Sequence, residues 1–227
     1  YSPAFAAVQF SGGRAYISVP AHPDFDIQAP MTAAGWIKRS GKFAKDNIFW
    51  QRSHKSAKGW AFCIEHDKLV FIAFDKSGDL LSNQNLKDTE WHHAAFVRTD
   101  DECWRMYIDG KLDNEGCGMR GSAPCLLPLY VGANLTWMGE PREFSDAALA
   151  DVAIWNAALT EDQVKSLARA RGKNLPEKTA PQNLKLFLPL NDFPPGTPIE
   201  GKIFKDLSGL GHDGTGSDPE GKVKVVE

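Results

Sequence analysis

The sequence lacks features that would assign it at once to several functional classes. No apolar run in its 227 residues approaches the ~18–20 residues of a membrane span. The formal net charge is only -3, and no basic stripe with interleaved aromatic residues is present. Such a stripe is the usual footprint of nucleic-acid binding. We therefore expect neither a membrane span nor a nucleic-acid partner.

Cysteine is scarce, with four residues at Cys63, Cys103, Cys117 and Cys125. No pair has Cys-x-x-Cys spacing, so neither a zinc site nor a redox motif is indicated. One arrangement joins Cys117 to Cys125 across a glycine-rich loop and Cys63 to Cys103 between strands, although four cysteines allow three pairings. Burial as small apolar residues of a cytosolic protein is the alternative. The disulfide interpretation favours a secreted or cell-surface protein.

The chain begins at Tyr1 rather than Met and shows no signal peptide, so we expect a mature form or an excised fragment. Its 42% hydrophobic and 11% aromatic residues are sufficient for a sizeable core. Short runs rich in aromatic and β-branched residues recur between Gly and Asp turns, which argues for a sandwich or jelly roll. The strands are expected at Ala7–Phe10, Ala15–Val19, Thr32–Lys38, Ile48–Arg52, Trp60–Glu65, Leu69–Asp75, Trp91–Arg98, Trp104–Ile108, Leu127–Gly132 and Val152–Trp155.

One short helix is expected in the C-terminal half of the chain. Thr160 and Gln163 have the spacing of a capping box, in which each side chain bonds the other's backbone N–H. Val164 and Leu167 then begin an apolar stripe, and Gly172 is a natural stop.

The stretch from Trp91 to Lys111 is the most informative. Two strand-like runs flank the acidic turn 99–102, and the second ends on Asp109-Gly110, which tolerates the positive φ of a tight turn. The stretch therefore predicts an antiparallel hairpin. Its sequence motifs, Trp-His-His and later Tyr-Ile-Asp-Gly-Lys, resemble those of the laminin-G-like domains of the concanavalin A-like lectin/glucanase superfamily. The resemblance implies an all-β antiparallel sandwich of jelly-roll type.

A second resemblance to the same family concerns the C-terminal segment, whose position along the chain differs from the family's usual order. The run 184–190 and the motif Asp-Leu-Ser-Gly-Leu-Gly-His-Asp-Gly at 206–214 match segments that come first in many such domains, yet here they come last. Either residues 184–227 complete a permuted sandwich or they begin a second repeat. We expect a single domain over 1–227, because a half-repeat would leave Leu186, Phe187 and Leu188 exposed.

Enzymatic activity is not expected. Glucanases of this superfamily use Glu-x-Asp-x-x-Glu on one strand, but Glu65-His66-Asp67 is not followed by a second Glu. His92 and His93 point to opposite faces of a strand, so they cannot hold one metal ion together. One is expected to be a hydrogen-bonded core histidine and the other a surface residue.

Calcium stays open as a cofactor, because relatives of this fold often carry it at the sandwich rim. Where family members often have acidic residues, this chain has Ser11 and Arg14 in one loop and Ala150 in another. Asp206 and Asp213 remain, although acidic residues in such a segment are often turn formers.

A glycan site needs flat rings and polar groups at their edges. Two loops offer these side chains, and nothing in the sequence identifies the ligand. The first loop contributes Trp137, Arg142, Asn134 and Glu140, and the second, basic loop contributes Trp50, Trp60, His54 and Lys58.

Three functions are therefore considered. The first is a non-catalytic carbohydrate-binding module, secreted or on the cell surface, with a glycan or polysaccharide as partner. The second is a structural or adhesive domain that binds protein. The third is a glycoside hydrolase with an atypical carboxylate pair.

Overall fold

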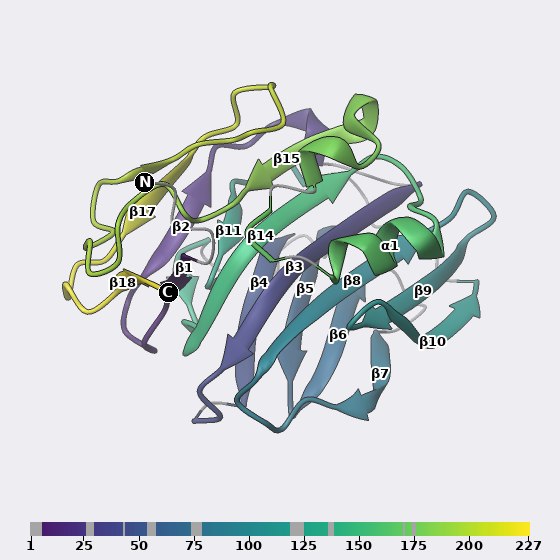
Figure 1. Ribbon diagram of the computed structural model, residues 1–227, viewed down its shortest axis with the longest axis horizontal. Helices are drawn as coiled ribbons and strands as arrows, with labels where there is room; N and C mark the ends of the chain where they lie inside the picture. Colours follow the sequence, from purple (N-terminus) through teal and green to yellow (C-terminus); the bar gives the residue numbers. More distant parts are fainter. Residues whose placement is uncertain are drawn as a thin grey trace.

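Two antiparallel β-sheets face each other and enclose the core (Figure 1). The computed structural model describes residues 6–25, 30–42, 44–53, 58–73, 79–118, 125–135, 139–169, 171–173 and 176–227, with backbone only at positions 50, 52, 53 and 73. The predicted all-β antiparallel sandwich with one short α-helix is confirmed.

The first sheet lies toward the viewer in Figure 1 and carries the helix on its outer face. Its order is β10 (Lys111–Cys117), β9 (Cys103–Ile108), β8 (Trp91–Arg98), β3 (Met31–Arg39), β14 (Ala147–Trp155), β1 (Ala7–Gln9) and β18 (Lys224–Val226), with β15 (Leu184–Leu188) also paired to β14.

The second sheet lies behind the first. Its order is β16 (Ile203–Phe204), β17 (Gly214–Ser217), β2 (Tyr16–Val19), β11 (Leu129–Val131), β4 (Lys45–Ser53), β5 (Lys58–Glu65), β6 (Lys68–Ala73) and β7 (Leu80–Asn85). A small ladder joins β12 (Asn134–Leu135) to β13 (Pro141–Arg142), and short 3-10 turns lie at η1 (Pro23–Phe25), η2 (Pro176–Lys178) and η3 (Pro181–Asn183).

Strand β8 shows why the first sheet is apolar on both faces. Alternate residues point to opposite sides, so Ala94 and Phe96 enter the core between the sheets, while Ala95 and Val97 pack on the outer face. The Phe96 ring stacks on Phe71 of the opposite sheet with centroids 3.5 Å apart. The strand is therefore buried through most of its length.

Helix α1 (Glu161–Leu167) covers the outer face of the first sheet. The predicted capping box is present: Gln163 N–H donates to Thr160 Oγ1, and Thr160 N–H donates to the Gln163 side chain. Val164 and Leu167 are buried in the same cluster as Ala95 and Val97. The helix is stabilised chiefly by this packing, because seven residues are too few for a stable isolated helix.

The hairpin of β8 and β9 is confirmed, but the predicted disulfide pairing was wrong. The bond joins Cys103 to Cys117 across β9 and β10. Cys63 is buried in strand β5, and Cys125 is buried ahead of β11. The sequence analysis also missed β7 and β10, whose exposed polar residues give little strand signal.

Residues 184–227 supply strands to both sheets. Strand β15 pairs with β14 and β18 pairs with β1 in the first sheet, while β17 pairs with β2 in the second. Leu186, Phe187 and Leu188 are fully buried. The two ends of the described chain pair directly, with Ala7 opposite Val226.

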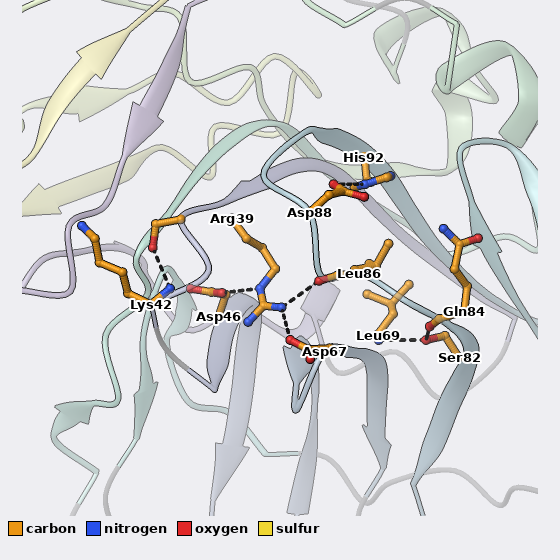
Figure 2. Close-up of polar contacts among 11 residues, drawn as sticks. Arg39, Lys42, Asp46, Asp67, Leu69, Ser82, Gln84, Leu86, Asp88 and His92 are labelled. Atoms are coloured by element: carbon orange, nitrogen blue, oxygen red, sulfur yellow. Dashed lines mark hydrogen bonds and ion pairs between the residues drawn. The ribbon is translucent and has the colours of Figure 1, made fainter.

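A buried ion network joins the two sheets at one end (Figure 2). Arg39, the last residue of β3, donates to Asp46 Oδ2, to Asp67 Oδ1 and to the Leu86 carbonyl, each at 2.8 Å. Asp46 Oδ1 accepts the Asp146 N–H at 2.9 Å. One guanidinium therefore holds β4, the β5–β6 turn and the residue after β7.

Among the helices in the described ranges, none has both the length and the apolar character needed to cross a membrane.

Candidate ligand-binding cleft

An open cleft of about 400 Å³ lies where the end of β13 passes the start of β4. Its lining consists of Gly12, Ala44, Lys45, Glu143 and Phe144. This volume lies within the usual range of small-ligand sites. The cleft is therefore large enough for a sugar residue.

Backbone hydrogen bonds hold the wall of the cleft. Ser145 accepts the Gly12 N–H at 2.8 Å and donates its own N–H to Gly132 at 2.9 Å. Glu143 has a left-handed φ of 46°, and its carbonyl accepts the Asn47 side chain at 2.6 Å. Glu143 and the following residue Phe144 are both part of the cleft lining.

Charged groups surround the Glu143 carboxylate. Lys45 Nζ lies 3.8 Å from Glu143 Oε2 and 3.3 Å from Glu65 Oε2, while Arg142 Nη2 lies 3.4 Å from Glu143 Oε1. The Asn134 amide also donates to Glu143. These groups offer both donors and acceptors at the edge of the cleft.

Half-buried aromatic rings continue from the cleft across the outer face of the second sheet. Phe144 stacks on Tyr16 with centroids 6.4 Å apart and planes at 22°, and Tyr16 meets Tyr130 edge-on at 5.6 Å. Flat apolar surfaces of this kind suit the apolar face of a sugar ring. The cleft therefore combines a flat wall with polar groups at its edge.

Residues of the first predicted loop lie beside this cleft. Asn134 is buried in β12 and contacts Glu143, while Arg142 is half-exposed in β13. Glu140 is exposed in the turn between these strands. Trp137 lies outside the described residues. The aromatic side chain that the structure places at the cleft is instead Phe144.

The second predicted loop does not share the cleft. Lys58 is exposed at the far end of the β4–β5 hairpin, about 25 Å along β4 from Lys45 at the usual rise per strand residue. Trp60 is buried in the core and donates to the Phe25 carbonyl at 3.0 Å, so its ring is not a surface platform. The Trp50 side chain and all of His54 lie outside the part of the chain that the structure describes.

Lys45, Glu143 and Phe144 were missed by the sequence analysis. Phe144 follows the predicted loop directly and could have been included as an aromatic loop residue. Lys45 and Glu143 lie 98 positions apart, and no local pattern reports their contact.

The carboxylates considered for catalysis or calcium already have partners. Glu65 lies 3.3 Å from Lys45, and Asp67 accepts from Arg39 at 2.8 Å. Asp206 and Asp213 accept backbone N–H groups within their own segment. Within the described ranges, the one grouping of three or more His, Cys, Asp or Glu side chains close enough to share a metal ion is His22, Asp24 and His212.

The two adjacent histidines of β8 lie in opposite environments. The His92 ring lies between Asp109 at 2.8 Å and Asp88 at 2.9 Å, and these hydrogen bonds raise the pKa of His92 to about 9. Burial lowers the pKa of His93 to about 4. The opposite facing was predicted, but the ring Nδ1 of His93 has no hydrogen-bond partner among the described residues. Neither histidine supports a shared metal site.

A small, partly enclosed pocket, lined in part by His93, Trp36 and Asp151, has room for about one water molecule. Asp151 has a left-handed φ of 48° at a β-bulge in β14, and its Oδ2 accepts the Gly172 N–H at 2.6 Å. Burial raises the pKa of Asp151 to about 6. This carboxylate faces the interior rather than a calcium-binding rim.

Asp151→Asn is expected to stabilise the protein at neutral pH. The folded pKa is above the ordinary 3.8, so the contribution of Asp151 to stability is fully present below about pH 4 and is lost as pH rises through about 6. Asparagine tolerates the positive φ and cannot ionise. The difference in unfolding free energy between variant and wild type should therefore grow by about 2–3 kcal/mol from pH 4 to pH 8. Urea titrations across this range measure it, and a constant difference would contradict the prediction.

The comparisons with known proteins agree with this architecture. A laminin G family model, described as the concanavalin A-like lectin/glucanases superfamily, matches residues 11–165, more than half of the chain. The chain belongs to this family.

Among curated proteins, a similar one is the rat (Rattus norvegicus) protein named Sushi, von Willebrand factor type A, EGF and pentraxin domain-containing protein 1. It is 33% identical over 132 residues, which cover 56% of this chain and 4% of that protein. The chain therefore spans only a small part of this relative.

Among solved structures, a putative carbohydrate binding protein from Bacteroides ovatus aligns with a TM-score of 0.69 and 20% identity, covering 98% of this chain and 59% of that one. Domains LG4-5 of the mouse laminin alpha1 chain align with a TM-score of 0.52 and 14% identity, covering 71% and 44%. At these identities the likeness shows the fold.

Proposed function

We propose that this chain is a non-catalytic carbohydrate-binding module of a secreted or cell-surface protein, and that it binds a glycan or polysaccharide in the cleft beside Phe144. The observation that carries the proposal is the pairing of a half-buried aromatic wall with the Lys45 and Glu143 side chains in a cleft of about 400 Å³. The structural neighbour described as a putative carbohydrate binding protein supports it. Arg142, Asn134 and Glu140 border the site, and Trp137 is proposed to contribute from the adjoining loop.

We also propose that the protein is located outside the cytoplasm. The Cys103–Cys117 disulfide supports an oxidising compartment outside the cytoplasm. We also propose that residues 1–227 form one domain, which the strand pairings of 184–227 with both sheets support.

Phe144→Ala is expected to weaken binding of any recognised glycan by about tenfold, because the sugar loses its stacking surface. Glu143→Gln should also weaken binding, since a charge-assisted acceptor becomes neutral. The experiment screens the wild type on a glycan array and measures the hits by calorimetry. Lys58→Ala is the matched control, because Lys58 lies at the far end of β4 and should leave binding unchanged.

Trp137→Ala is tested separately. If this variant alone loses glycan binding, the binding site lies on the loop rather than in the cleft. Thermal unfolding of each variant controls for folding. If no glycan binds, the proposal fails in favour of a protein-binding adhesive domain. Hydrolysis of a polysaccharide that is abolished by replacing one carboxylate would favour the glycosidase alternative.

A further inference from the structure

Three side chains from distant parts of the chain meet beside η1. Asp24 Oδ2 lies 3.0 Å from His212 Nε2 and 3.3 Å from His22 Nδ1. The three ligand atoms all lie within 4.8 Å of one another. Tetrahedral zinc bonds of ~2.0–2.1 Å place ligand atoms ~3.3 Å apart. The two Asp24 contacts are close to this spacing, and the two imidazole nitrogens have to approach it from at most 4.8 Å.

The cluster has a shielded side and an open side. The side chain of His212 is 11% exposed and that of Asp24 is 25% exposed, whereas that of His22 is 47% exposed. An ion held here would reach the two inner ligands from solvent past His22, and one position would remain open for water.

Surrounding contacts fix the inner ligands in place. The backbone N–H of His212 donates to Asp206 Oδ2 at 2.9 Å, and the His212 ring packs edge-on against Phe25 at 5.0 Å. The Phe25 side chain is buried, and its carbonyl accepts the Trp60 indole. Preorganisation of this kind lowers the cost of assembling a metal site.

Both imidazole rings border the Asp24 carboxylate. The Asp24 N–H donates to the lone pair of His22 Nδ1 at 3.2 Å, and the same nitrogen lies 3.3 Å from Asp24 Oδ2. An ion bound at Nδ1 would replace this long hydrogen bond. The rings of His22 and His212 lie only 4.4 Å apart, so both imidazoles border the same space. Two imidazoles and one carboxylate can therefore face a single ion.

One positive group competes for the same carboxylate. Lys185 Nζ lies 3.5 Å from Asp24 Oδ1, the oxygen that faces away from the histidines. It neutralises part of the Asp24 charge and should weaken, but not block, binding at Oδ2.

We propose that His22, Asp24 and His212 bind a divalent transition metal ion of the zinc class. Two imidazole nitrogens and one carboxylate oxygen are the ligands that zinc accepts, whereas calcium requires oxygen ligands throughout. The ion joins the segment after β2 to the β16–β17 loop, 188 positions away, and so ties the C-terminal segment to the N-terminal half. Zinc should therefore raise the unfolding temperature.

The test titrates the untagged chain with Zn²⁺ and, for its absorption spectrum, with Co²⁺. We expect one site per chain and a rise in unfolding temperature with Zn²⁺ but not with Ca²⁺. His22→Ala, Asp24→Asn and His212→Ala should each weaken binding by about tenfold or more and abolish the thermal shift. His66→Ala, which removes an exposed histidine elsewhere, should change neither.

Lys185→Gln separates a metal site from general damage to this region, because it should tighten Zn²⁺ binding by removing the competing ammonium. Circular dichroism confirms that each variant is folded. Zinc binding that is equal in the wild type and in both histidine variants would overturn the proposal, as would a failure to bind Zn²⁺ in the wild type.

Discussion

Arg39→Met is expected to lower the free energy of unfolding by about 3–5 kcal/mol. The guanidinium is buried with Asp46, and it also holds Asp67 and the Leu86 carbonyl (Figure 2). Removing it leaves the Asp46 carboxylate charged in a buried site without its cation. Urea unfolding at pH 7, followed by tryptophan fluorescence, measures the loss.

Two further variants show whether the loss comes from the orphaned charge. Arg39→Lys keeps the positive charge but cannot reproduce a fork of donors to three acceptors, so an intermediate loss is expected. Adding Asp46→Asn to Arg39→Met removes the uncompensated charge while an amide oxygen can still accept the Asp146 N–H. The double variant should therefore be more stable than Arg39→Met alone. If it is less stable, the network acts through packing instead.

The position of Arg39 illustrates what the sequence could not predict. An arginine at the end of an apolar strand gives no sign of its partners, which lie 7, 28 and 47 positions away in three different elements. The strand itself was predictable, because alternation and turn residues are local properties of the chain. Contacts between elements depend on how the two sheets face each other.

The disulfide pairing could not be predicted from the sequence either, although both cysteines lie in one hairpin. The Asp109-Gly110 turn sets Lys111 opposite Ile108, and an unbroken ladder would then place Gly116 opposite Cys103. A bulge between Leu112 and Asn114 adds one residue, so Cys117 takes that position instead. Asp113, the extra residue, accepts two backbone N–H groups of β7. The pairing thus depends on a bulge that the sequence did not reveal.

The candidate cleft was predicted only at its border. Asn134, Glu140 and Arg142 were chosen because they share a loop, which is local information. The opposite wall comes from the start of β4 and the turn after β1, and these reach the loop only through the folded register. The burial of Trp60 could not be predicted either. Its strand has apolar residues at successive positions, so the sequence pattern does not indicate which side chains face the core.

Asp206→Ala is expected to lower the free energy of unfolding by about 3–4 kcal/mol, because one buried carboxylate accepts four hydrogen bonds. Its oxygens receive the backbone N–H groups of Phe187, Ser208 and His212, at 2.9 Å each, and the Ser208 hydroxyl at 2.6 Å. Phe187 lies in β15, so this carboxylate joins the loop after β16 to the first sheet. Thermal and urea unfolding measure the loss.

Asp213→Ala is the matched control from the same motif. Asp213 is partly exposed and accepts the Asp206 N–H and the Lys205 ammonium, so its removal should cost about 1 kcal/mol. Equal losses in the two variants would show that the motif acts as a plain turn. A much larger loss at Asp206 would mean that this carboxylate organises the C-terminal segment, including the backbone of His212. The same variant should then also lose Zn²⁺ binding, because the imidazole is no longer held toward Asp24.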